Sequence, residues 1–229
     1  MKKVHLLTLI ALIMLGLSGC EKAKVTNEAS ADVFVKAIKN ASGTTVYAAI
    51  HTVFSYNAMK SVSVSSPGGT PLLLTNFENG GNSFFNEPAI ADYSATAPAS
   101  GAYTYLVKFN DGEEITYNNS LATATLLPAN ITSMVKNATG DSISVSWNAI
   151  AGAHGYQFKF LKGTTQVYFQ AAFLENSPVK PSWTAKLPIS KLNSSGSGTY
   201  TFELTGLLFE TTEFDYIQAI STATKDIAL

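Results

Sequence analysis

The chain has 229 residues, of which 46% are hydrophobic and 14% are charged, and its formal net charge is −1. This apolar content excludes a disordered chain, which requires low hydrophobicity and high net charge. All 15 basic residues are lysine. A nucleic-acid-binding role is therefore excluded as well, because it requires a basic face and usually bidentate arginines.

Residues 1–19 are predicted to be a signal peptide that is removed from the mature chain. Lys2 and Lys3 provide a positive start, and an apolar stretch of twelve residues follows from Leu6 to Leu17. That stretch is too short for a membrane-spanning helix, which requires about 20 apolar residues, but it suits the central part of a signal peptide.

The signal segment ends in Leu17-Ser18-Gly19-Cys20, which resembles the lipobox of bacterial lipoproteins. The resemblance implies that Cys20 receives a diacylglycerol and becomes the first residue, which anchors the protein to a membrane. Residues 20–29 are then expected to be a tether between the lipid and the fold. Glu21 stands where some Gram-negative lipoproteins carry an aspartate that retains them at the inner membrane. This favours the outer membrane and leaves its periplasmic or surface face open.

Cys20 is the only cysteine in the chain. The exported protein therefore forms no internal disulfide, and burial alone must hold the fold together. Apart from the acylated Cys20, the mature chain has no thiol that could act as a nucleophile. It also has no other cysteines to form a metal site.

The remaining chain is predicted to be all-β. Polar and apolar residues alternate in residues 61–65, 142–147 and 156–160, and this two-residue period is typical of half-buried strands. Asp32–Asn40 is ambiguous, because Phe34 and Ile38 also have helical spacing, and we interpret it as the first strand. Asn110-Asp111-Gly112 between two apolar runs indicates a β-hairpin.

A domain boundary is predicted near Leu127-Pro128, since proline ends the preceding strand. The flanking segments, 30–127 and 130–229, each have the size of one antiparallel β-sandwich of about 100 residues. We therefore expect two tandem sandwiches.

The second half resembles a fibronectin type III domain. The resemblance rests on Trp147 at the end of the second strand, Tyr156 on the third, and the pair Leu192 and Tyr200 near the sixth. It implies that Trp147 and Tyr156 are buried and that Tyr200 forms a corner with Leu192. The first half more loosely resembles a bacterial immunoglobulin-like module through Gly101–Phe109. Both families are scaffolds, so the resemblance implies fold and not activity.

Catalytic motifs are sparse. His51 lies in an apolar strand and His154 in a turn, so we expect structural or solvated roles for both. Glu113 and Glu114 are adjacent on a strand and point to opposite faces. The sequence has no Gly-x-Ser-x-Gly, phosphate loop or dinucleotide fingerprint. We predict no catalytic residue, no metal and no cofactor, although a triad assembled in space stays open.

Aromatic residues are the one surplus, with 13 Phe, 10 Tyr and 2 Trp. Phe84 and Phe85 stand beside asparagine and glutamate in an expected loop, and Trp183 follows a proline. These three are candidate ligand-binding residues, because exposed rings in polar surroundings can stack on sugars. The alternative is a loop that folds back over the end of a sandwich.

The function predicted is a membrane-anchored lipoprotein that acts as a non-catalytic binding, adhesion or scaffold module. Its ligand, protein or glycan, is unknown, and nucleic acid is not expected. One alternative is a glycan-binding accessory lipoprotein of a carbohydrate uptake system. Another is an enzyme with its site at the domain junction, which convergent carboxylates in a cleft there would favour.

Overall fold

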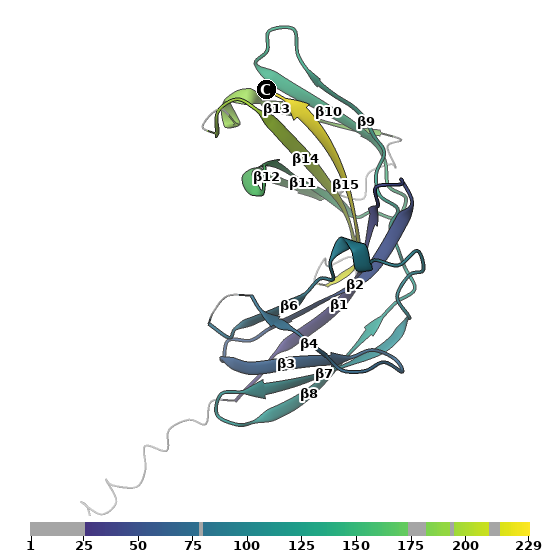
Figure 1. The fold of residues 1–229 in the computed structure, drawn as a ribbon, viewed down its shortest axis with the longest axis vertical. Coiled ribbons are helices and arrows are strands. Elements are labelled where there is room, and N and C mark those ends of the chain that lie inside the picture. The colour runs from purple at the N-terminus through teal and green to yellow at the C-terminus, as the bar shows by residue number, and fades with distance from the viewer. Residues whose placement is uncertain (1–25, 78–79, 174–181, 193–194, 211–215) are drawn as a thin grey trace, which may run out of the picture.

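The computed structural model describes residues 26–77, 80–173, 182–192, 195–210 and 216–229, and the regular secondary structure of these residues is almost entirely β-strand (Figure 1). This confirms the all-β prediction. The first half contains eight strands in its described residues: β1 (Ser30–Lys39), β2 (Thr45–Phe54), β3 (Met59–Ser65), β4 (Leu72–Leu73), β5 (Thr75–Asn76), β6 (Ser83–Asn86), β7 (Gly101–Phe109) and β8 (Glu114–Leu121), with a 3-10 turn, η1 (Ile90–Asp92), before β7.

The described residues of the second half add seven strands: β9 (Ile131–Lys136), β10 (Ser142–Asn148), β11 (Gly155–Lys162), β12 (Thr165–Phe173), β13 (Ser182–Pro188), β14 (Thr199–Phe209) and β15 (Ile217–Ala228), with a 3-10 turn, η2 (Ile189–Lys191), after β13. The strands form three sheets. Their orders are β12-β11-β14-β15-β1-β2-β6-β5, β13-β10-β9 and β4-β3-β7-β8.

The first sandwich places the sheet β4-β3-β7-β8 against the β1-β2-β6 part of the long sheet. Val62 and Val64 of β3 are buried while the serines that alternate with them are not, as the two-residue period predicts. Val33 and Val35 of β1 belong to the same core. The β7–β8 hairpin is confirmed, and Gly112 supplies the positive φ of 94° that its turn needs.

The second sandwich packs β13-β10-β9 against β12-β11-β14-β15. Trp147 and Tyr156 are buried, with their ring centroids 5.6 Å apart, and Phe202 of β14 lies against Trp147. The Tyr200 hydroxyl donates a hydrogen bond to the Gly196 carbonyl, and the Leu192 carbonyl lies 3.4 Å from the same hydroxyl oxygen. Burial of the two rings and the tyrosine corner are therefore confirmed. Three strands, β13-β10-β9, thus face the four strands β12-β11-β14-β15 in a β-sandwich.

One strand joins the two halves. Residues 219–222 of β15 pair in parallel with residues 35–38 of β1 and, on the other side, antiparallel with β14. The long sheet therefore continues from one half into the other through the middle of the molecule (Figure 1). The connecting segment is also packed, since Leu126 and Ala129 are buried in the common core. Independent folding of 30–127 and 130–229 stays a prediction.

A second, smaller core lies on the other face of β1 and β2. Phe34 and Ile50 are buried there beneath Tyr93, which follows η1. The segment around η1 is held by paired backbone hydrogen bonds between Tyr47 and Ser94, of 2.7 and 3.0 Å. This packing fixes the position of the residues just before η1, including Glu87.

The signal peptide, Cys20 and the tether as far as residue 25 lie outside the described residues. Within the described part of the chain, no helix is long and apolar enough to cross a membrane.

Candidate functional site: a junction cleft and an aromatic groove

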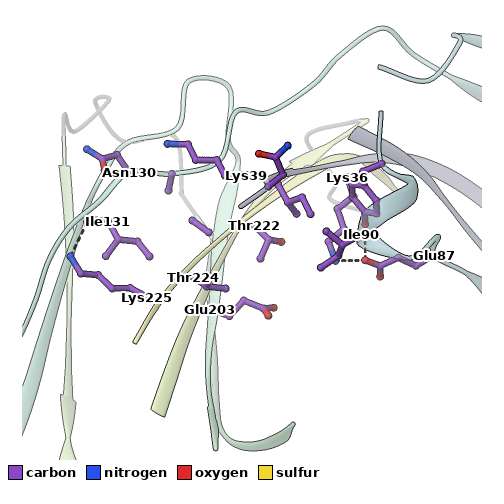
Figure 2. A pocket seen from close by; sticks show the side chains of 15 residues that line it. Lys36, Lys39, Glu87, Ile90, Asn130, Ile131, Glu203, Thr222, Thr224 and Lys225 are labelled. Carbon is purple, nitrogen blue, oxygen red and sulfur yellow. Dashed lines mark hydrogen bonds and ion pairs between the residues drawn. The ribbon is translucent and has the colours of Figure 1, made fainter. Parts of the chain in front are cut away.

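A cleft of about 480 Å³ lies at the junction of the two halves (Figure 2). Its walls come from the end of β1, the segment around η1, residues 129–131, and β14 with β15. Figure 2 shows Lys36 and Glu87 on one side, and Asn130, Ile131 and Lys225 on the other. Because β1 and β15 are hydrogen-bonded neighbours, the two sides are held together by one sheet.

The two carboxylates of this cleft are each paired with a lysine. The Lys36 Nζ lies 2.6 Å from Glu87 Oε1, and the Tyr93 hydroxyl donates to the same oxygen over 2.7 Å. Burial, and then the bond and charge of Glu87, raise the pKa of Tyr93, so its hydroxyl keeps the proton it donates. Glu203 lies 2.8 Å from Lys159 Nζ. Both acids are thus held in ion pairs with lysines.

The balance of charge in the cleft is positive. Lys36 and Lys159 offset the two glutamates, while Lys39 and Lys225 have no ion-pair partner among the described residues. Lys39 is exposed, and the Lys225 Nζ donates to the Ile131 carbonyl over 3.4 Å. The cleft is therefore equipped for polar and anionic contacts.

A groove of about 360 Å³ adjoins this cleft along β5 and β6. Phe77 has 69% of its surface exposed and meets the half-buried Phe85 edge to face, with ring centroids 6.0 Å apart. Asn76 and Asn86 supply amides beside the rings, and Glu87 lines both the groove and the cleft. Glu87 is thus the residue that the two recesses share in their linings, and its carboxylate is fixed by Lys36 and Tyr93.

Of the two adjacent phenylalanines predicted as exposed, only one reaches the surface. Phe84 is 5% exposed and belongs to the main core, so the expectation that it is available to a ligand is wrong. The physical reason is strand pleating. Phe84 pairs with Val53 and faces the main core, whereas Phe85 pairs with Thr52 and points to the other face of the sheet, where it packs in part against the smaller core. The role of Phe85 in ligand binding stays a prediction.

Trp183 lies in the other half, on β13, opposite Trp147. It is half-buried against the core, and its ring centroid is 5.8 Å from that of Tyr156. The structure therefore does not bring Trp183 together with Phe85, and a shared patch is not formed.

Several residues of the site escaped the sequence reasoning. Phe77 stands between Asn76 and Glu78, the same aromatic-in-polar setting that singled out Phe85, so this signal could have found it. The cleft lysines come from separate strands. No local pattern marks them.

The two histidines of the described chain bond to the fold. The Tyr105 hydroxyl donates to the Asp32 carbonyl over 2.9 Å and lies 3.0 Å from His51 Nδ1. Since the hydroxyl has one proton, His51 Nδ1–H is the donor to it. Burial lowers the pKa of His51 to about 4. His154 Nδ1 accepts the Phe209 N–H over 3.3 Å.

Within the described residues, no group of three or more His, Cys, Asp or Glu side chains is placed to hold a metal.

Neither a protein-family model nor a curated protein matches the chain. Among solved structures, the chain is similar to a provisionally assigned carbohydrate binding protein from Bacteroides uniformis ATCC 8492, with 11% identity and a TM-score of 0.36 over 86% of this chain and 99% of that one. A tandem-repeat segment of a large adhesion protein gives 12% identity and a TM-score of 0.30, over 87% of this chain and 50% of that one. A two-domain fibronectin type III segment of chicken tenascin gives 11% identity and a TM-score of 0.28, over 89% of this chain and 98% of that one.

Proposed function

We propose that this chain is an exported lipoprotein, acylated at Cys20 and held at the outer membrane, that binds an extended ligand without catalysis. The observation that carries the binding role is the meeting of the aromatic groove and the junction cleft at Glu87. A ligand of several linked units can occupy both recesses, whereas a compact ligand needs only one.

A glycan is the ligand that suits this surface best. The exposed face of Phe77 and the edge of Phe85 offer a stacking platform of the kind that takes the apolar face of a sugar ring. Asn86 and the ordered Glu87 carboxylate can hydrogen-bond to hydroxyls beside it. In the cleft, Lys39 and Lys225 can bind the carboxylate of an acidic sugar farther along the same glycan. Capture of glycan for uptake is the cellular role that follows.

A binding role is favoured over an enzymatic one by the state of the carboxylates. A general base needs a carboxylate that is free to reach the proton it abstracts. The Glu87 and Glu203 carboxylates instead lie 2.6 and 2.8 Å from the ammonium groups of Lys36 and Lys159. These two ion pairs hold the carboxylates in fixed positions, which suits the binding of a ligand.

The binding proposal is tested on a glycan array with the mature chain carrying Cys20→Ala, which removes the lipid. Phe77→Ala is the informative variant, since its ring is exposed and its loss leaves the core intact. Each 1.4 kcal/mol of lost contact weakens binding about tenfold. Phe169→Ala, which removes another exposed ring on β12, is the matched control. Unchanged affinity in a folded Phe77→Ala variant would refute the groove as the site.

The anchoring proposal is tested separately in cells. Cys20→Ala should abolish lipid attachment and cleavage at that residue, and it should alter partition into the membrane fraction. Unchanged processing together with unchanged membrane partition would refute the lipoprotein assignment, whatever the glycan array shows.

A further inference from the structure

We infer that Phe54 and Tyr56 form an aromatic pair that rests in the headgroup layer of a zwitterionic phospholipid bilayer; the inference depends on the proposed anchoring at Cys20. Phe54 ends β2 with 46% of its surface exposed, and Tyr56 in the following turn is 92% exposed. Their ring centroids lie 5.2 Å apart at an interplanar angle of 82°. Tyr56 is almost wholly exposed and Phe54 nearly half exposed, so much of the apolar surface of the pair meets solvent.

The aromatic pair lies where the chain enters the fold. The Ser55 hydroxyl donates to the Glu28 carbonyl over 2.6 Å, and the Asn57 side-chain amide donates to the Thr26 carbonyl over 3.0 Å. The turn that carries Tyr56 is therefore bonded to the first described residues. Figure 1 shows β1 running from this end of the first sandwich toward the second half, so the pair lies at the end away from that half.

The length of the tether keeps this end close to the lipid. Five residues, 21–25, separate Cys20 from Thr26. At about 3.3–3.6 Å per extended residue, the six steps from Cys20 to Thr26 reach at most about 22 Å. The acylated residue lies at the bilayer surface, and each headgroup layer is about 5–8 Å thick. A segment of this length lets the aromatic pair reach the headgroups.

The chemistry of the pair matches that layer. Tyrosine has an apolar ring and a polar hydroxyl, and such side chains concentrate at the membrane–water interface. The charges at the same end favour neither sign of lipid, because Lys22 and Lys24 of the tether offset the acids beside the entry point. The Asn27 side-chain amide donates to the Asp111 and Glu113 carboxylates, over 2.8 Å each, so negative charge flanks the entry point. Contact with neutral headgroups through the rings is the arrangement that remains favourable.

The test places a fluorescent reporter at the pair in the full acylated protein. Tyr56→Trp is reconstituted in phosphatidylcholine vesicles whose acyl chains carry bromine, a short-range quencher. Trp147 and Trp183, the chain's own tryptophans, both lie in the second half and provide the background. Phe169→Trp places an exposed indole on β12 of that half and is the matched control. We expect quenching of the indole at position 56 and none of the added indole at 169.

The outcomes separate the inference from the anchoring on which it depends. Failure of the acylated protein to float with the vesicles refutes the anchoring itself. Suppose that the acylated protein floats with the vesicles but that the fluorescence of Tyr56→Trp, like that of Phe169→Trp, is the same in brominated as in plain vesicles. This result overturns the membrane contact. Adding Phe54→Ser to Tyr56→Trp should weaken the quenching. Unchanged quenching there would show that tether proximity alone, and not the aromatic pair, brings position 56 to the lipid.

Discussion

His51 provides a prediction with a definite sign. Its buried ring donates from Nδ1 to the Tyr105 hydroxyl, and burial lowers its pKa from 6.5 to about 4. The folded state therefore resists protonation of this ring more than the unfolded chain does. The stability that neutral His51 contributes is complete above pH 6.5 and is lost as the pH falls toward 4.

The size of the effect follows from the two pKa values. With 6.5 in the unfolded chain and about 4 in the fold, acidification from about pH 7.5 to pH 5 removes about 2 kcal/mol of stability through this residue. His51→Gln keeps a side chain that can donate to Tyr105 and does not titrate. The variant should therefore lack this loss.

Asp32 acts in the opposite direction and conceals part of the effect. Burial, and then the charge of Glu210, raise the pKa of Asp32 from 3.8 to about 6. Because the folded state takes up this proton more readily, acidification below pH 6 favours folding. Asp32 is partly exposed, so the gain at pH 5 is about 1 kcal/mol after solvent screening. The wild-type protein should lose only about 1 kcal/mol over this range.

The assay is urea unfolding at pH 7.5 and pH 5 for three proteins. The wild type should lose about 1 kcal/mol on acidification, Asp32→Asn about 2 kcal/mol, and His51→Gln should gain about 1 kcal/mol. The opposite slopes of the two variants are the signature. Parallel pH profiles for His51→Gln and the wild type would refute the assignment of a buried neutral imidazole.

Three further predictions concern the core of the second half and are read by urea unfolding. Tyr156→Phe removes the hydroxyl that accepts the Ile150 N–H over 2.8 Å, which leaves a buried donor unpaired. It should cost about 1–3 kcal/mol, and a change below 0.5 kcal/mol would contradict this role. Phe202→Ala removes a fully buried ring that contacts Phe158 and Phe160. It should cost about 3–5 kcal/mol, against less than about 0.5 kcal/mol for the exposed Phe169→Ala. Ser221→Ala removes a buried hydroxyl without a hydrogen-bond partner in the described chain, and it should leave stability unchanged or raise it by up to about 1 kcal/mol. A loss beyond 1 kcal/mol would show that this hydroxyl is paired.

Local patterns predicted the strands well, because pleating imposes a two-residue period that residues such as Val62 and Val64 display directly. Asp32–Asn40 was also interpreted correctly, since β1 covers Ser30–Lys39. The buried positions of Trp147 and Tyr156 followed from the resemblance to fibronectin type III domains. These are features that a short stretch of sequence carries by itself.

The features that failed or were missed depend on partners distant in sequence. The local sequence does not distinguish Phe84 from its neighbour Phe85. Only the pairing of β6 with β2 decides which of the two rings faces the core. Glu87 becomes the meeting point of groove and cleft through Lys36 and Tyr93, one of them 51 positions away along the chain. Parallel pairing of β1 with β15 leaves no local signal in either strand. Such contacts are set by the assembled sheet.

That parallel pairing also constrains the order in which the protein can fold. Val35 and Ala219 are 184 positions apart in the chain, yet they are neighbours in the sheet. Until β15 docks, one edge of β1 presents unpaired N–H and C=O groups, and closing so long a loop is slow. The first half therefore completes its sheet only after the last strand in chain order is in place. A fragment ending at residue 127 would expose that edge, and two such fragments could pair through it.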